Sequence, residues 1–281
     1  MHDGEIDPLR EINKSALAIL CIDNAKNLRR PAFLYDQQTG KVRSRTDFED
    51  LIQAAYDTLL LTRGRLDLKQ HIQPMASLLY EAFLNTHEHA QTDFFGNRYR
   101  RSTRGIIFAH QSVEIERLVD MAGHNIQMQE YFSKWRPNHH GAKYAHFAEI
   151  SIFDSGPGLA DRWLGSRAEI SRSIQYDPID VSDEYSAVLA CLQKGNTTKN
   201  SSTRGNGLFR IMQVVKRSGG LIRIRSGRLA LMKAFNLEKY TDLERLDFEI
   251  EDMKKGGIPD YPLSWAAGTA ISVMIPLNRG F

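Results

Sequence analysis

The chain has 281 residues, of which 42% are hydrophobic and 25% are charged, and its formal net charge at pH 7 is +3. A chain of this length can bury enough surface to fold without disulfides or metal ions, and so small a net charge does not indicate nucleic-acid binding. Cys21 and Cys191 lack metal-ligand spacing, and no apolar run reaches the ~20 residues that span a bilayer, so we expect a cytoplasmic protein.

Apolar residues recur at helical spacing in three segments of the chain. The first covers residues 47–61, and the second runs from about residue 74 to residue 90, with a proline where the first turn of a helix tolerates it. The third helix begins at Gly207 and is predicted to end at Gly219-Gly220, because glycine adopts the left-handed conformation that closes many helices.

Several other segments are predicted to be strands, because apolar residues run through them. They are residues 105–109, 113–119, 146–153, 221–226, 229–235 and 268–276. The first two are expected to pair with each other, and the third is apolar enough to be a buried strand. Helices and strands follow each other without the regular alternation of a βαβ fold. We therefore predict an α+β fold, a two-layer sandwich of helices on a mixed β-sheet.

The predicted second helix carries a polar strip beside its apolar face. Glu81, Asn85, Glu88 and His89 fall within about 100° of one another on a helical wheel. An amide oxygen such as that of Asn85 can coordinate Mg²⁺, and a neighbouring carboxylate can orient or deprotonate water. The pattern of this segment alone is also explained by an ordinary amphipathic surface helix.

A turn with the sequence Asp154-Ser-Gly-Pro-Gly follows the predicted buried strand. A carboxylate held at a strand end can accept a hydrogen bond from an exocyclic amine, and this contact distinguishes adenine from guanine. Gly156 and Gly158 leave the main chain bare, so that a flat base can approach it. Because Asp, Ser, Gly and Pro all favour turns, a plain loop is the alternative at this point.

Two glycines, Gly205 and Gly207, lead into the third predicted helix. Free backbone N–H groups and the positive end of the helix dipole make such a helix start an anion-binding site. Lys194, Lys199 and Arg204 precede it, and they either reach phosphate oxygens or are simply solvated. The segment is neither a Walker loop nor a dinucleotide-binding fingerprint, and a flexible hinge is the alternative interpretation.

In this order, the motifs resemble those of the GHKL ATPase superfamily, which includes gyrase B, the large heat-shock chaperone, sensor histidine kinases and mismatch-repair ATPases. The matching segments are Glu81-x-x-x-Asn85-x-x-x-His89, Asp154-x-Gly156-x-Gly158, Gly205-x-Gly207-Leu208 and Gly268-Thr269. The first is similar to the family's N box, and the next two are similar to its glycine boxes. The resemblance covers about residues 75–278.

The resemblance implies an ATP-binding domain of the Bergerat fold at 71–281, with a lid over about 159–204 and an N-terminal extension of unknown role at 1–70. It also implies ATP and Mg²⁺ as ligands. Glu81 would be the general base or water-orienting acid, Asn85 the Mg²⁺ ligand, and Asp154 the acceptor for the adenine amine. The further nucleotide contacts that it implies are His89, Gly156, Gly158, Lys199, Arg204, Gly205, Gly207, Leu208 and Thr269.

Three functions remain open. The chain is an ATPase that acts as a conformational switch with a protein partner or a second copy, a serine/threonine kinase, or a nucleotide-sensing module that hydrolyses little ATP. His89 matches a histidine of the anti-sigma-factor kinases. A self-phosphorylating histidine kinase is excluded because only His2 and His71 precede the N box, and His71 is too near to it.

A basic run precedes the predicted strand at 105–109, and it consists of Arg98, Arg100, Arg101 and Arg104. We expect a solvated loop here. Contact with nucleic acid or with an acidic partner is the alternative, because arginine side chains attract phosphates. Neither nucleic-acid binding nor membrane binding is favoured by the sequence as a whole.

Overall fold

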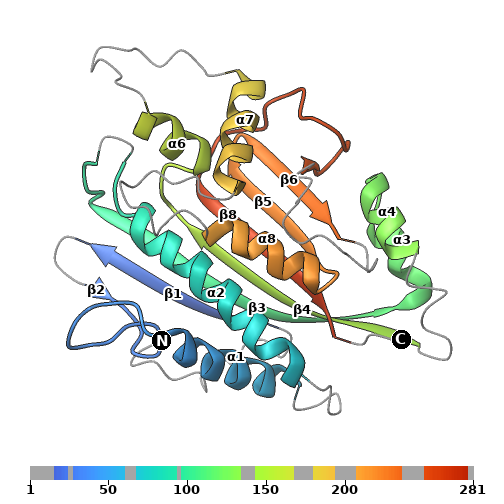
Figure 1. Cartoon of the computed structure of the whole chain (residues 1–281), viewed down its shortest axis with the longest axis horizontal. Coiled ribbons are helices and arrows are strands. Elements are labelled where there is room, and N and C mark those ends of the chain that lie inside the picture. The colour runs from blue at the N-terminus through green and yellow to red at the C-terminus, as the bar shows by residue number, and fades with distance from the viewer. Residues whose placement is uncertain are drawn as a thin grey trace.

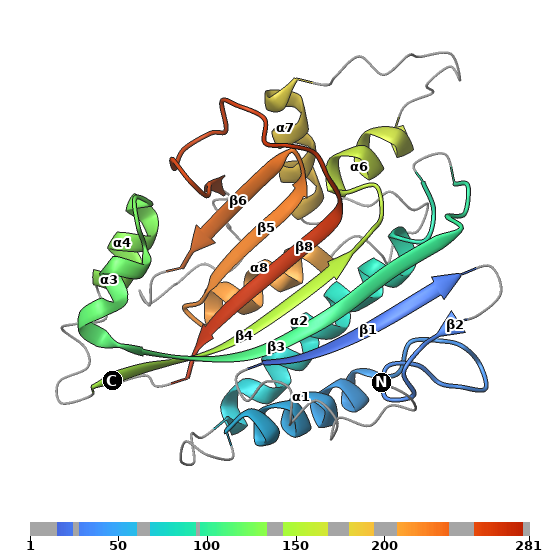
Figure 2. The ribbon, with the colours of Figure 1, turned by 180° about the vertical axis from the view of Figure 1, so that it is seen from behind.

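The computed structural model is an α+β fold in which one open sheet carries helices on its face (Figures 1 and 2). It describes residues 16–24, 28–60, 68–93, 96–133, 143–167, 180–193, 207–235 and 250–277. In these ranges, no helix has both the length and the apolar character needed to cross a membrane.

The sheet has eight strands in the order β2-β1-β3-β4-β8-β5-β6-β7. Their bounds are β1 (Ala16–Asn24), β2 (Leu28–Arg29), β3 (Arg101–Glu114), β4 (Tyr144–Asp154), β5 (Leu221–Gly227), β6 (Leu229–Ala234), β7 (Glu251–Asp252) and β8 (Ala266–Pro276). All the pairings between these strands are antiparallel.

The predicted α+β class is confirmed, but the prediction of a mixed sheet was wrong. The two helices between β1 and β3 explain why. Helix α1 (Arg45–Leu60) runs away from the end of the sheet at which β1 terminates, and α2 (Lys69–His89) runs back toward that end (Figure 1). Strand β3 therefore starts opposite Asn24, with Arg101 as its partner, and runs antiparallel to β1.

Helices α1, α2 and α8 (Gly207–Arg217) lie on one face of the sheet, with α7 (Val181–Leu192) beside α8 and α6 (Leu159–Arg167) beside α7 (Figure 1). Their apolar stripes and the inward side chains of the strands form the main core. The predicted stripe of α1 is buried from Phe48 to Leu59, and Ile211 and Val215 of α8 are buried as well.

A smaller core covers one end of the opposite face of the sheet. It is built by η2 (Ile115–Arg117), α3 (Leu118–Met121) and α4 (Ile126–Ser133), which pack on outward side chains of β4, β5, β6 and β8. Phe132 contacts Phe147 there, edge to face. The molecule therefore has a partial third layer that the sequence did not predict.

Three predicted elements differ by more than two residues from those in the structure. Helix α2 begins at Lys69, so that Pro74 lies inside it, because buried His71 and Met75 pack the additional turn against the fold. The strand predicted to end at residue 109 continues to Glu114, because backbone pairing with β4 does not depend on side-chain polarity. The second strand predicted at 113–119 is instead the end of β3 followed by η2 and α3.

The stretch at 159–204, predicted to be a polar lid, contains α6 and α7. Trp163, Tyr185 and Val188 of these helices are buried in the main core. Residues 168–179 and 194–204 of the predicted lid lie outside the described part of the chain. The described part of the stretch is therefore packed helix, and its pattern was missed because polar residues interrupt the apolar stripe.

The chain before residue 61 also contributes to the main core. Strand β1 pairs with β3 along its whole length, and α1 packs against α2. Leu17, Ile19 and Phe48 are buried among the same side chains as α2. Residues 16–24 and 28–60 thus share one sheet and one core with the segments that carry the predicted motifs.

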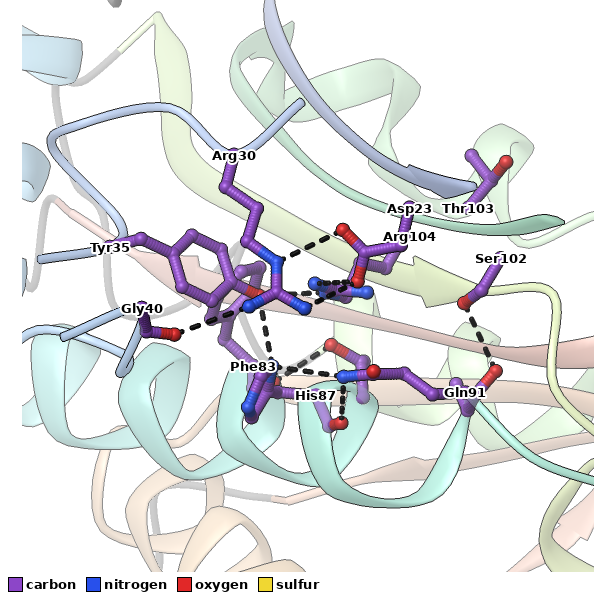
Figure 3. Close-up of polar contacts among 12 residues, drawn as sticks. Asp23, Arg30, Tyr35, Gly40, Phe83, His87, Gln91, Ser102, Thr103 and Arg104 are labelled. Carbon is purple, nitrogen blue, oxygen red and sulfur yellow. Dashed lines mark hydrogen bonds and ion pairs between the residues drawn. The ribbon is translucent and has the colours of Figure 1, made fainter. Parts of the chain in front are cut away.

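A buried polar cluster fixes α2 against the sheet (Figure 3). Fully buried Arg104 of β3 donates from Nη2 to Asp23 of β1 at 2.9 Å and from Nε to the hydroxyl of Tyr35 at 2.8 Å. Arg30 donates to both carboxylate oxygens of Asp23, at 3.0 and 2.8 Å. The prediction that the arginine run forms a solvated loop was wrong for Arg104, because Asp23 compensates its charge inside the fold.

His87 connects α2 to this cluster. Burial lowers the pKa of its imidazole to about 4, and the charge of Arg104 adds to the effect, so the ring is neutral near pH 7. Its Nδ1 forms a hydrogen bond of 3.2 Å with the Tyr35 hydroxyl. Because His87 is two residues from Asn85, it lies about 200° around the helix from it. Holding His87 against the sheet therefore turns Asn85 away from β1, toward α8.

We predict that Asp23→Ala destabilises the protein by about 3–5 kcal/mol, because it leaves a buried guanidinium without its counter-charge. Urea unfolding measures the change. The matched control is Asp260→Ala, which removes an exposed ion pair with Lys255 and is expected to cost less than about 1 kcal/mol. Equal losses in the two variants would show that the cluster does not hold the fold.

Candidate functional site

Helix α2 ends against the turn that follows β4. Gly156 packs so closely here that a Cβ at its position would lie 2.8 Å from the Cα of Ala90, nearer than real Cβ atoms approach. Arg162 of α6 donates hydrogen bonds to the carbonyl oxygens of His89 and Thr92. These bonds satisfy carbonyls near the C-terminus of α2, where no further turn follows to pair them. The turn, α6 and the end of α2 are therefore held together.

Asp154, the last residue of β4, uses one carboxylate oxygen for hydrogen bonds within the fold. Its Oδ1 accepts from the backbone N–H groups of Gly156 at 2.8 Å and of Thr269 at 3.3 Å. Within the described residues, Oδ2 accepts no hydrogen bond. Burial raises the pKa of this carboxyl to about 6, although both hydrogen bonds act in the opposite direction. The carboxylate is therefore desolvated and retains one oxygen for a donor from outside the chain.

Strands β5 and β8 close the other side of the same turn. Ser226 of β5 accepts a hydrogen bond from the backbone N–H of Leu159 at 2.8 Å, and its hydroxyl lies 3.3 Å from that of Thr269. Gly158 has a φ of +92°, and a Cβ there would lie 3.0 Å from the Ser226 oxygen. Only glycine suits this conformation and this space. Gly158, Thr269 and Asp154 thus come together at one place.

A second glycine contact brings α8 to α2. A Cβ at Gly207, the first residue of α8, would lie 3.2 Å from Asn85 Nδ2 and 3.5 Å from Glu81 Oε2. Asn85 and Glu81 are one turn apart on α2. The start of α8, with the N–H groups that its helix leaves unpaired, therefore lies against the amide and the carboxylate.

Glu81 is held by two arginines from neighbouring helices. Arg45 of α1 donates to its Oε1 at 3.1 Å, and Arg210 of α8 donates to the same oxygen at 2.8 Å. The Glu81 side chain is only 13% exposed, whereas those of Arg45 and Arg210 are 46% and 53% exposed. A largely buried carboxylate with two solvent-reaching cations therefore lies beside the start of α8.

The two glycine contacts lie close together along α2. Asn85 precedes Ala90 by five residues, or about 7.5 Å along the helix axis. Because Gly207 contacts Asn85 and Gly156 contacts Ala90, the turn after β4 and the start of α8 border the same stretch of helix. The three segments that the sequence predicted to converge therefore lie together, whereas the roles of their residues in nucleotide binding stay predictions.

The remaining predicted residues fall into three groups. Leu208 packs, partly buried, against the main core as part of the apolar stripe of α8. His89 lies in the last turn of α2, and its carbonyl accepts a hydrogen bond from Arg162. Lys199, Arg204 and Gly205 lie outside the described residues.

The sequence did not predict four residues that shape this site: Arg45, Arg162, Arg210 and Ser226. A signal existed for Arg210, since it follows Gly207 by three residues and therefore projects near it on the helix. No local pattern marks Arg45, because it reaches Glu81 only through the packing of α1 on α2. The same holds for Ser226, which reaches the turn from a different strand.

Comparison with known proteins gives no family assignment. No family model, no curated protein and no solved structure matches the chain. The site is therefore defined by its own geometry, in which the turn after Asp154 and the glycine-led start of α8 both contact the last turns of α2.

We predict that Asp154→Asn stabilises the protein at pH 7.5 but not at pH 4. The folded pKa of about 6 lies above the ordinary value of 3.8, so stability is lost as pH rises from 4 to 6 and the buried carboxyl ionises. The amide keeps an acceptor for both backbone N–H groups and avoids that loss, which is on the order of 1–3 kcal/mol. Urea unfolding of both proteins at both pH values measures the gain. A variant no more stable than wild type at pH 7.5 would contradict it.

Proposed function

We propose that the protein binds ATP at this site and acts as a Mg²⁺-dependent ATPase whose nucleotide state changes its contact with a protein partner or a second copy of itself. The observation that carries the proposal is that the turn after Asp154 contacts the end of α2 at Ala90, while Gly207 contacts Asn85 and Glu81 of the same helix. The order of the motifs resembles that of the GHKL superfamily, and it adds support that does not depend on the geometry.

The adenine end of the ligand fits the turn after β4. Asp154 offers its Oδ2 to the exocyclic amine, and ionisation of this desolvated carboxyl becomes favourable when a donor reaches it. Gly156 and Gly158 allow the turn that carries Asp154 to pack closely against α2 and Ser226. Guanine has a carbonyl oxygen at the position of the amine, so the same acceptor would repel it.

The phosphate end fits the start of α8. The first N–H groups of a helix have no partner within the helix, and together with the helix dipole they favour anions there, while Gly207 keeps the approach free of a side chain. Asn85 supplies an amide oxygen of the kind that Mg²⁺ accepts, and the described residues hold no cluster of three His, Cys, Asp or Glu. A single amide ligand fits Mg²⁺, because this ion commonly keeps several waters and binds substrate phosphates. The ion would neutralise part of the phosphate charge.

Glu81 is placed to act on water. In hydrolysis, a water oxygen forms a bond to the terminal phosphorus while the bond to the bridging oxygen breaks, giving ADP and phosphate. Glu81 Oε2 lies on the side of Gly207, where it would take the proton that this water loses. Asn85, one turn along, would hold the ion on the phosphate side of the same helix.

A second candidate function follows from the state of Glu81. Because Arg45 and Arg210 both donate to its Oε1, this oxygen is already engaged by two ion pairs, and Oε2 is the one that faces Gly207. This arrangement favours a nucleotide-sensing module that hydrolyses ATP slowly. Incubation with γ-labelled ATP separates the possibilities: free phosphate identifies an ATPase, intact bound ATP a sensor, and label on protein a kinase.

For the ATPase, we expect Glu81→Gln to retain nucleotide binding while turnover falls by ~10²–10⁴-fold, because a positioned base is removed. Phosphate release measures turnover, and titration calorimetry measures binding. Glu130→Gln, an exposed change on α4, is the control and is expected to leave both unchanged. Wild-type turnover in Glu81→Gln would exclude Glu81 as the base.

We expect Asp154→Asn to weaken ATP binding by about 10–100-fold at pH 7.5, although the same variant is predicted to be more stable than wild type. The reason is that a hydrogen bond to a charged acceptor is lost, which is worth about 1.5–3 kcal/mol. Titration calorimetry with ATP at saturating Mg²⁺ tests it, with Asp260→Ala as the control. If the affinity is unchanged, Asp154 does not read the base.

A further inference from the structure

Glu81 joins three helices through a single carboxylate oxygen. Its Oε1 accepts from Arg45 of α1 and from Arg210 of α8, while its Oε2 faces the first residue of α8, Gly207. Two guanidinium groups against one carboxylate leave a net charge of +1. This excess positive charge lies beside the start of α8, which itself favours anions.

The two arginines keep most of their hydrogen-bonding capacity for another partner. A guanidinium has five N–H donors, and each of these arginines gives one to Glu81. Each side chain is also about half exposed, so that ion pairs of this kind contribute little to folding stability. Arginine binds phosphate through two parallel hydrogen bonds, a geometry that gives both affinity and specificity.

The positions of Arg45 and Arg210 indicate that this further partner is the terminal phosphate of the nucleotide. Arg210 lies one turn after Gly207 on α8, so both project on neighbouring parts of the helix surface. Arg45 reaches the same carboxylate from the opposite side, on α1. A phosphate received at the start of α8 is therefore flanked by both arginines and by Glu81.

We infer that Arg45 and Arg210 exchange Glu81 for the terminal phosphate of the bound nucleotide. They thereby distinguish a triphosphate from a diphosphate, and they leave the Glu81 carboxylate free only when the phosphate to be cleaved is present. The inference rests on the proposed function and adds to it a specificity determinant and a regulation of the base. It requires no residue outside the described part of the chain.

Calorimetry with a non-hydrolysable ATP analogue and with ADP tests the inference on the full chain, and circular dichroism confirms folding. Arg45→Ala and Arg210→Ala are each expected to weaken binding of the analogue by about 10–100-fold and to leave ADP affinity unchanged. The reason is that only the terminal phosphate loses a charged hydrogen bond. Arg210→Lys is expected to give an intermediate loss, because it keeps the charge without the paired donors. Arg217→Ala, at the other end of α8, is the matched control.

Glu81→Gln gives the opposite result if the inference is correct. Removing the competing carboxylate charge releases both arginines. The analogue should therefore bind the variant more tightly than the wild-type protein, whereas ADP should bind the two proteins with equal affinity. Ion pairs with a merely structural role would not produce this gain.

Equal losses for the analogue and ADP in the arginine variants would overturn the inference, and so would unchanged binding of both. In either case nucleotide binding by the wild-type protein would remain, and the proposed function would stand. A wild-type protein that binds neither nucleotide would overturn both.

Discussion

The site depends on the contact between the backbone of Gly156 and the end of α2 at Ala90. No side chain fits between them, so the turn after β4 approaches the helix more closely than it could with any residue other than glycine at position 156. Gly207 makes a similar approach to Asn85 a turn and a half earlier on α2. Both contacts require α2 to be placed to within a fraction of an ångström. The buried cluster around Arg104 contributes to that placement through Tyr35 and His87.

Two features of the site carry a cost in stability. The carboxyl of Asp154 is partly buried without a counter-charge at hydrogen-bonding distance, and its raised pKa expresses that cost. The three charges around Glu81 leave one cation in excess, and so do those of Asp23, Arg30 and Arg104. The two clusters differ in solvent access, because Arg104 is fully buried whereas Arg45 and Arg210 are about half exposed.

Much of the architecture was predictable from local patterns. The stripe from Phe48 to Leu59 predicted α1, and the spacing of apolar residues after Gly207 predicted α8 and its end, where Gly219 adopts a φ of +57°. Patterns failed where tertiary contacts outweighed them. Polar His110 continues β3 because β4 supplies its backbone partners, and the start of α2 moved to Lys69 because packing supports an additional turn. Buried Arg104 looked like part of a solvated run because its partners come from distant segments.

The sequence by itself determined which residues can bind an amine, an anion and a metal ion, because those capacities belong to the side chains and to glycine. It also determined most helices, since an apolar stripe is a local property. Only the tertiary structure decided that Asp154 is desolvated, that Glu81 is held by Arg45 and Arg210, and that every strand pairing described is antiparallel. Desolvation, ion pairing and strand direction depend on which distant segments meet, and a local pattern carries no information about distance in space.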